Sequence, residues 1–273
     1  MKAVSLFANI GVAEAYLKGI GVDVVVANEL IERRAKLYSQ IYPDTNMICG
    51  DITDDKIFEK IAKSCENEGI DVLMATPPCQ GMSTAGPQDE DDARNSLICP
   101  VIKMVERLKP RYVFIENVPL FYNTEIIVED EKIMIPALID KKLGNDYIIN
   151  KYVIDTKDYS VPQTRERAIM LLTRKDQKRE WIVPDKDKKI VTMNEASGGL
   201  PELDPYVKDV TPEELEKMLP HYEERRKAAL KISRWHIPPH HVKRQVIAMQ
   251  HTPTGCTAFD NPVFFPVKEN GEP

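Results

Sequence analysis

One cysteine stands where a thiol could act as a nucleophile. The apolar run of residues 70–75 is short, partly β-branched and followed by proline, which predicts a buried strand. Pro77 and Pro78 lack backbone donors and restrict φ, so they stiffen the turn after that strand. Open α/β sheets bind ligands at the carboxyl ends of their strands, and Cys79 follows at that point. Cys79 is therefore a candidate nucleophile, although most isolated cysteines are buried structural residues.

Acidic residues follow three other predicted strands, namely Glu29, Asp51 and Glu116. Glu29 lies roughly 20 residues after a turn that contains Gly11, which suits hydrogen bonding to ribose hydroxyls. The three-glycine fingerprint of pyrophosphate-binding turns is absent, which favours an adenosine-containing cofactor without a phosphate, S-adenosylmethionine. Glu116 could protonate a bound heterocycle if burial raises its pKa. The alternatives are helix capping for Glu29 and Asp51, and a solvated strand end for Glu116.

The elements that must position these residues alternate between strand and helix. Strands are expected at 2–7, 23–28, 47–49, 70–75, 112–115, 147–154 and 168–172. Helices are expected from the first turn to about residue 18, and at 30–42, 54–65 and 97–108. This alternation predicts an α/β fold with a doubly wound, mainly parallel sheet, and the short gap before the last strand predicts an antiparallel hairpin.

The character of the chain changes after Thr173, where charged and proline-containing stretches replace the alternation. Helices are expected at 212–218 and 221–233, and no periodicity is sustained from Trp235 onward. We therefore expect a sheet domain of residues 1–180 and a small, irregular C-terminal region of residues 181–273.

Composition sets limits on function. The 273 residues are 42% hydrophobic and 29% charged, as in ordinary globular proteins, without a membrane-length apolar segment or a signal-peptide pattern. Five cysteines without a C-x-x-C pair suggest neither a disulfide framework nor a metal site, and fit a reducing cytoplasm. The net charge of −6 argues weakly against a nucleic-acid partner, yet residues 225–250 hold seven Lys or Arg and no acid.

Six short segments occur in the order of the motifs of one enzyme family. They are Phe7-Ala8-Asn9-Ile10-Gly11, Gly50-Asp51-Ile52-Thr53, Pro78-Cys79-Gln80, Arg94 to Leu97, Glu116-Asn117-Val118 and Gln163-x-Arg165-x-Arg167. Together they resemble the cytosine carbon-5 DNA methyltransferases of bacterial restriction–modification systems, over about residues 3–172. The resemblance implies a Rossmann-like S-adenosylmethionine-dependent methyltransferase sheet.

The resemblance also implies methyl transfer to carbon 5 of a cytosine that is flipped out of double-stranded DNA. Cys79 would add to carbon 6 and make carbon 5 enamine-like. Glu116 would hold or protonate ring nitrogen 3 and bond the exocyclic amine. Arg165 would lie near the carbonyl oxygen of the base, and Arg167 near the cysteine and a phosphate.

For the cofactor, the resemblance implies that Phe7 stacks near the adenine, Glu29 binds the ribose hydroxyls and Asp51 binds the adenine amine. The further cofactor candidates are Ala8, Asn9, Ile10, Gly11, Leu30, Ile52, Pro78 and Leu97. The DNA-binding candidates are Gln80, Ser83, Arg94, Gln163, Arg225, Arg234 and Arg244. Arg225, Arg234 and Arg244 could equally form a solvated helix face. The loop 81–92 would close over DNA, in the cytoplasm of a bacterium or phage host.

The chain departs from the family pattern in two respects. Asn9 stands where the family usually has glycine, which crowds the cofactor side of the turn, and Leu30 stands where an aromatic residue is frequent. No segment resembles the ninth or tenth motif, the latter of which completes the cofactor pocket in the family. We therefore expect a piece of a split enzyme completed by a second polypeptide, or a truncated product, with residues 181–273 as the start of an incomplete target-recognition region.

Two other functions compete with this interpretation. A tRNA cytosine methyltransferase would keep the chemistry, but the Cys-Phe-Thr tripeptide of that branch is absent from the sequence. A catalytically silent subunit that binds DNA or a partner would not need the set of Cys79, Glu116, Arg165 and Arg167.

Overall fold

The computed structural model describes residues 1–78, 96–187, 189–201, 203–232, 236, 238–253, 255–257 and 260–261. Contacts divide the chain into two compact units, Met1–Val191 and Thr192–Pro273. The candidate cofactor residues lie in the first unit, together with Glu116, Arg165 and Arg167.

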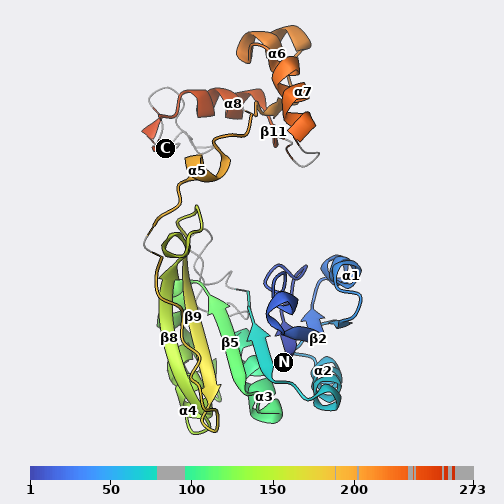
Figure 1. Ribbon diagram of the computed structural model, residues 1–273, viewed down its shortest axis with the longest axis vertical. Helices are drawn as coiled ribbons and strands as arrows, with labels where there is room; N and C mark the ends of the chain where they lie inside the picture. The colour runs from blue at the N-terminus through green and yellow to red at the C-terminus, as the bar shows by residue number, and fades with distance from the viewer. Residues whose placement is uncertain are drawn as a thin grey trace. The chain divides into compact units, whose positions relative to one another are not determined.

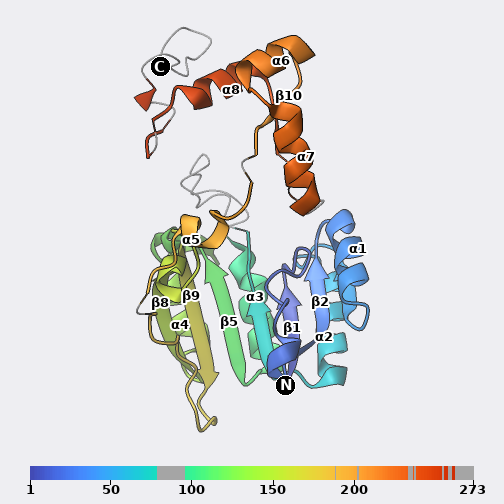
Figure 2. The same ribbon diagram turned by 45° about the horizontal axis from the view of Figure 1, so that its top comes forward.

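A seven-stranded sheet forms the centre of the first unit, with the spatial order β3-β2-β1-β4-β5-β9-β8 (Figure 1). Its strands are β1 (Lys2–Leu6), β2 (Asp23–Glu29), β3 (Asn46–Cys49), β4 (Val72–Ala75), β5 (Tyr112–Asn117), β8 (Tyr147–Asp155) and β9 (Glu166–Arg174). The first five pair in parallel, whereas β9 runs antiparallel to both β5 and β8 (Figure 2). The predicted mainly parallel sheet and its antiparallel hairpin are confirmed. Strand order reverses between β1 and β4, where such sheets form a ligand crevice.

Three helices cover one face of this sheet: α2 (Asp55–Glu68), α3 (Ile98–Leu108) and α4 (Ile135–Leu143). Their apolar residues join the strands in one core, in which Leu73 and Val113 have no exposed surface. The N-cap of helix α2 is Asp54, whose carboxylate accepts hydrogen bonds from the N–H groups of Lys56 and Ile57. The helices α2 and α3 therefore confirm the helices expected at 54–65 and 97–108.

The opposite face is covered at one side by α1 (Glu32–Ile41). Successive residues of β3 point to opposite faces of the sheet. Ile48 joins the core under α2, α3 and α4, whereas Met47 packs with Tyr38 of α1. Elsewhere this face is covered by Val22 and by Trp181, whose ring lies edge-on to that of Tyr112 with 5.9 Å between centroids. Both faces of the sheet are therefore covered, as a doubly wound fold requires.

The helix expected to extend to about Lys18 is not present, so that prediction is wrong. The chain instead makes turns closed by i to i+3 hydrogen bonds, such as Leu17 N–H to the Glu14 carbonyl at 3.0 Å, and a 3-10 helix at Lys18–Ile20. Gly11 and Gly21 take φ values of +83° and +78°, which an α-helix does not contain.

A small hairpin of β6 (Glu125–Val128) and β7 (Glu131–Met134), and the helix α4, were not expected from the sequence. The hairpin turn lacks the usual Asn-Gly or Asp-Gly signal. Glu129 and Asp130 take the left-handed conformation instead, at φ values of +53° and +65°.

The second unit contains four helices and one pair of short strands among its described residues. These are α5 (Met193–Ser197), α6 (Pro212–Met218), α7 (Tyr222–Ile232), α8 (Lys243–Gln250), β10 (Tyr206–Val207) and β11 (His240–His241). The helices expected at 212–218 and 221–233 are confirmed, whereas α8 lies where no periodicity was expected. Its single buried residue, Val246, explains the weak pattern. No helix in the described part of the chain is both long and apolar enough to cross a bilayer.

Candidate cofactor and catalytic site

A pocket of about 690 Å³ is bordered by the carboxyl ends of the parallel strands, at the reversal of strand order. It brings together eight of the predicted cofactor residues, namely Phe7, Asn9, Glu29, Leu30, Asp51, Ile52, Pro78 and Leu97. The predicted catalytic residues Glu116, Arg165 and Arg167 line the same pocket. The residues Ala8, Ile10 and Gly11 are not among its lining, and Ala8 is buried behind the turn.

Glu29 anchors the cofactor side of the pocket. It ends β2 and is only 5% exposed. One carboxylate oxygen, Oε2, accepts the N–H of Asn9 at 2.9 Å, and the other, Oε1, accepts the N–H of Ile31 at 2.9 Å. The carboxylate thus joins the turn after β1 to the start of α1. Each oxygen keeps a further lone pair with which it could accept a hydroxyl.

The turn after β1 has an unusual backbone that its residues accommodate. Phe7, Asn9 and Gly11 have φ values of +59°, +52° and +83°. Asparagine is one of the few side chains that occupies this region readily, so Asn9 keeps the shape that glycine would provide. At Gly11 a Cβ atom would lie 2.2 Å from the Tyr42 ring, and the Tyr42 hydroxyl donates to the Gly11 carbonyl at 2.5 Å. Only glycine fits at that position.

Asp51 lies at the end of β3, and it does not cap the following helix. Its Oδ1 atom accepts the N–H of Thr53 at 2.9 Å and the hydroxyl of the same residue at 2.7 Å. Asp54 is the N-cap of α2, which removes the capping alternative for Asp51. Asn28 donates from its side chain to the carbonyls of Ile48 and Gly50 at 2.9 and 3.0 Å, and so holds the end of β3 beside β2.

Glu116 and Arg167 form an ion pair on the other side of the pocket, with 2.8 Å between Oε1 and Nε. The antiparallel register pairs Glu116 with Ile169, and Arg167, two residues before Ile169, lies on the same face of the sheet as a diagonal neighbour of Glu116. Burial raises the pKa of Glu116, and the charge and hydrogen bond of Arg167 act in the opposite direction. The raised pKa makes Glu116 a better proton donor near neutral pH than a solvated glutamate.

The segment that leads to Cys79 is fixed between the ends of two strands. Asn117 donates from its side chain to the Pro77 carbonyl at 3.2 Å, and Thr76 donates to the Phe7 carbonyl at 3.3 Å. Cys79 follows one residue after the described segment ends. The predicted residues Cys79, Gln80, Ser83, Arg94 and Arg234 lie outside the described residues.

Arg165 reaches the pocket from the turn between β8 and β9. Its N–H donates to Asp155 Oδ1 at 3.0 Å, and its carbonyl accepts the N–H of Thr156 at 3.1 Å. These bonds hold the backbone while the side chain remains exposed. Gln163, in the same turn, is exposed and does not line the pocket.

Sequence reasoning missed four residues that shape this site: Asn28, Arg34, Tyr42 and Thr76. A polar residue that ends an otherwise apolar strand, such as Asn28, is a signal that could have been used. Arg34 lines the pocket from α1, with its NH1 atom 3.8 Å from Glu29 Oε1.

Basic residues of the second unit have acidic neighbours. Arg225 lies 3.5 Å from Asp204, and Lys243 lies 3.2 Å from Glu214. Both acids precede the window 225–250, so the sequence count did not include them. Arg244 is exposed on α8. The basic charge of the second unit is therefore partly neutralised in the folded chain.

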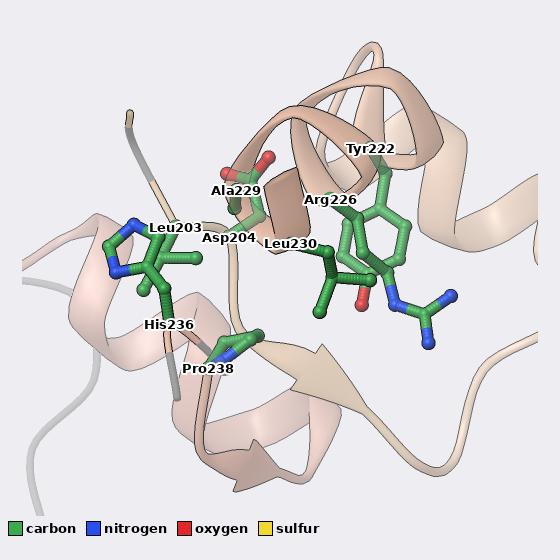
Figure 3. Close-up of a pocket in the computed structure, with 8 residues that line it drawn as sticks. All are labelled: Leu203, Asp204, Tyr222, Arg226, Ala229, Leu230, His236 and Pro238. Atoms are coloured by element: carbon green, nitrogen blue, oxygen red, sulfur yellow. The ribbon is translucent and has the colours of Figure 1, made fainter. Parts of the chain in front are cut away.

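A small cavity of about 90 Å³ lies inside the second unit (Figure 3). Tyr222 and Arg226 border it on one side, and Leu203 and His236 on the other. The Tyr222 hydroxyl is buried there without a hydrogen-bond partner among the described residues. Ligand pockets are typically about 300 Å³ or larger, so this cavity has room for a few water molecules and not for a nucleoside.

Within the described ranges, no group of three or more His, Cys, Asp or Glu side chains could hold a metal ion. Acidic oxygens in the pocket are engaged by backbone N–H groups, a threonine or an arginine.

Comparison with known proteins agrees with this geometry. The chain is 38% identical over 273 residues to the type II methyltransferase M1.HgaI of Avibacterium volantium, covering 98% of this chain and 70% of that protein. It is 29% identical over 177 residues to the type II methyltransferase M.HhaI of Haemophilus parahaemolyticus, covering 64% of this chain and 50% of that protein. The solved structure of the Entamoeba histolytica methyltransferase EhMeth has a similar fold, with a TM-score of 0.56, 20% identity, and coverage of 80% of this chain and 66% of that one.

The chain thus spans 70% of one of these relatives and half of the other. Residues 1–260 match the family described as C-5 cytosine-specific DNA methylase. With the strand-end pocket and the motif order in place, the chain belongs to the C-5 cytosine-specific DNA methylase family.

Proposed function

We propose that this chain transfers a methyl group from S-adenosylmethionine to carbon 5 of a cytosine in double-stranded DNA, as the modification enzyme, or one piece of it, of a restriction–modification system. One observation carries the proposal. A single pocket has the acids Glu29 and Asp51 on one side and the Glu116–Arg167 pair on the other, next to the segment that leads to Cys79.

The described residues fit S-adenosylmethionine. The lone pairs that Glu29 keeps can accept the two ribose hydroxyls, and Asp51 can accept an adenine amine through Oδ2. The volume of about 690 Å³ lies in the range of small-molecule sites. When bound, the cofactor supplies an electrophilic methyl group on a positively charged sulfur, a charge that suits the acids of this pocket.

For the cytosine, this chain supplies the nucleophile, the acid and the contact to the carbonyl oxygen. The Cys79 thiolate adds to carbon 6 of the flipped cytosine, and the electron pair becomes available at carbon 5. Glu116 donates to ring nitrogen 3 and accepts from the exocyclic amine, while Arg167 holds its carboxylate. Arg165 lies by the carbonyl oxygen. Once carbon 5 has used that electron pair to take up the methyl group, loss of the carbon-5 proton to a base expels Cys79 and restores the ring.

DNA contacts are proposed for the exposed residues Gln163 and Arg244, for Arg225, and for Gln80, Ser83, Arg94 and Arg234. Contacts of arginine with phosphate release counterions, so they would make DNA binding fall steeply with salt. A DNA substrate of this kind implies action in the bacterial or phage-host cytoplasm.

Cys79→Ser is expected to abolish both methyl transfer and a covalent complex with duplex DNA that contains 5-fluorocytosine, because the weaker hydroxyl nucleophile cannot form the adduct. The complex is measured by its mobility on a denaturing gel, with S-adenosylmethionine present. Cys49→Ser, at an exposed cysteine outside the pocket lining, is the matched control and should behave as wild type. A complex that persists in Cys79→Ser contradicts the assignment. Faster methylation of tRNA than of duplex DNA would favour the tRNA alternative.

Arg167→Leu is expected to move the alkaline limb of the rate profile to higher pH. A carboxyl with a raised pKa keeps its proton to higher pH, and a step that needs protonated Glu116 slows as pH rises through that pKa. Arg167 opposes the rise, so its removal raises the pKa of Glu116 further. Single-turnover rates of methylation are measured on unmethylated genomic DNA over a series of pH values. The pH at which the alkaline limb falls does not depend on the absolute rate. Arg167→Lys keeps the charge and should shift the limb less. If the alkaline limb of Arg167→Leu stays at the same pH as in wild type, Glu116 is not the acid.

A second polypeptide is proposed to pack against the segment after β1. Three apolar side chains spaced four residues apart, Val12, Tyr16 and Ile20, are 73%, 88% and 74% exposed. Single exposed apolar residues are ordinary, whereas exposed apolar patches mark interaction surfaces, so three such side chains within nine residues of one segment support this proposal.

The double variant Val12→Lys and Tyr16→Lys should lose co-purification with the product of the neighbouring reading frame, since lysines cannot be buried at an apolar interface. Ile127→Lys, at a residue 60% exposed on β6, serves as the control and should retain the complex. Full methyl transfer by this chain alone would refute the need for a partner.

A further inference from the structure

Glu14 is a buried acid for which the proposed reaction has no use. It is 3% exposed, and both of its carboxyl oxygens are buried without a hydrogen-bond partner in the described part of the chain. The side chains around it in sequence behave in the opposite way, since Val12 and Tyr16 are largely exposed. Glutamate is almost never fully buried unless it is paired. The segment after β1 therefore turns its acid inward at a cost that calls for an explanation.

Two tyrosines are the titratable groups that interact with Glu14, Tyr38 of α1 and Tyr42, which follows that helix, and Ser5 of β1 lies beside it. Burial raises the pKa of Glu14, and the Ser5 hydroxyl and the backbone N–H of Glu14 act against the rise. Burial first, and then the charge of Glu14, raise the pKa of Tyr38 and of Tyr42. The Tyr38 hydroxyl is also buried without a partner among the described residues. These groups form one polar cluster between β1 and α1.

This cluster is joined to the cofactor turn through Tyr42. Its hydroxyl donates to the Gly11 carbonyl at 2.5 Å, and its ring fills the space that a Cβ atom of Gly11 would need. The rings of Tyr38 and Tyr42 lie 4.8 Å apart, so a movement of one displaces the other. On its other side the same turn presents the N–H of Asn9 to Glu29. A change behind the turn therefore reaches the residues that border the pocket.

We infer that Glu14 is a positioning residue for the cofactor turn, acting through Tyr42 and Gly11 while its own carboxyl is neutral. A neutral carboxyl can remain between β1 and α1, whereas an ionised one needs water or a cation there. Ionisation would therefore open the space behind Tyr42 and loosen the turn. The inference rests on the proposed function only for the identity of the ligand.

The raised pKa of Glu14 determines how the stability of the fold changes with pH. An acid whose pKa is raised by folding contributes its full stability below its ordinary pKa. That contribution is lost as pH rises through the raised value. Wild-type affinity for the cofactor should therefore fall as Glu14 ionises, and Glu14→Gln, which cannot ionise, should keep the acid-side affinity.

The test is calorimetric titration of the full chain with S-adenosylmethionine from mildly acidic to mildly alkaline pH. Wild type is expected to lose about tenfold in affinity relative to Glu14→Gln across the transition. Glu116→Gln removes the acid with a raised pKa that lines the pocket, and the difference between wild type and Glu14→Gln should persist in the Glu116→Gln background. Equal affinities of wild type and Glu14→Gln at every pH would overturn the inference.

A second measurement needs no ligand. The thermal midpoint of Glu14→Gln should equal that of wild type at acidic pH and exceed it at alkaline pH, because only wild type must bury a charge. Equal midpoints throughout would contradict a neutral buried Glu14. If no variant binds S-adenosylmethionine at any pH, the proposed function fails, while the difference in midpoint still decides the state of Glu14.

Discussion

The carboxylate of Glu29 is the interaction on which the pocket depends. It is nearly buried, and it accepts the N–H of Asn9 and the N–H of Ile31 at 2.9 Å each. Hydrogen bonds to a carboxylate are stronger than neutral ones, and removal of the acceptor would leave both N–H groups unpaired. One side chain thus holds the turn after β1, the end of β2 and the start of α1 in a single arrangement.

The other residues reach the pocket because of sheet topology. Parallel strands end at one edge, so β1, β2, β3, β4 and β5 each deliver their following residues to the same crevice. The antiparallel β9 runs the other way, and it begins beside the end of β5. Arg167 therefore meets Glu116. Burial raises the pKa of Glu116, and the Arg167 guanidinium remains its ion-pair partner. Bonds from Asn117 and Thr76 fix the proline segment between these two groups of residues.

Much of this arrangement could be predicted from the sequence. Apolar runs as short as those ending at Ala75 and Ala27 mark buried strands, and acids that follow them mark the ligand edge. The positions of Glu29, Asp51 and Glu116 around one pocket follow from that rule alone. The contacts that shape the pocket could not be predicted, because Tyr42 meets Gly11 only through tertiary packing. The turns at residues 8–21 could not be predicted from the sequence pattern for the same reason. Their inward residue is Glu14, whereas an amphipathic helix would have buried Val12 or Tyr16.

The most direct measurement of the central claim is the affinity of the Glu29→Gln variant for S-adenosylmethionine by calorimetry. The amide has one acceptor in place of two oxygens and presents a donor to a backbone N–H. We expect affinity to fall by about tenfold or more, which corresponds to about 1.4 kcal/mol for one hydrogen bond lost. Glu32→Gln, at the exposed first residue of α1, should bind as wild type does. Wild-type affinity in Glu29→Gln would contradict the account.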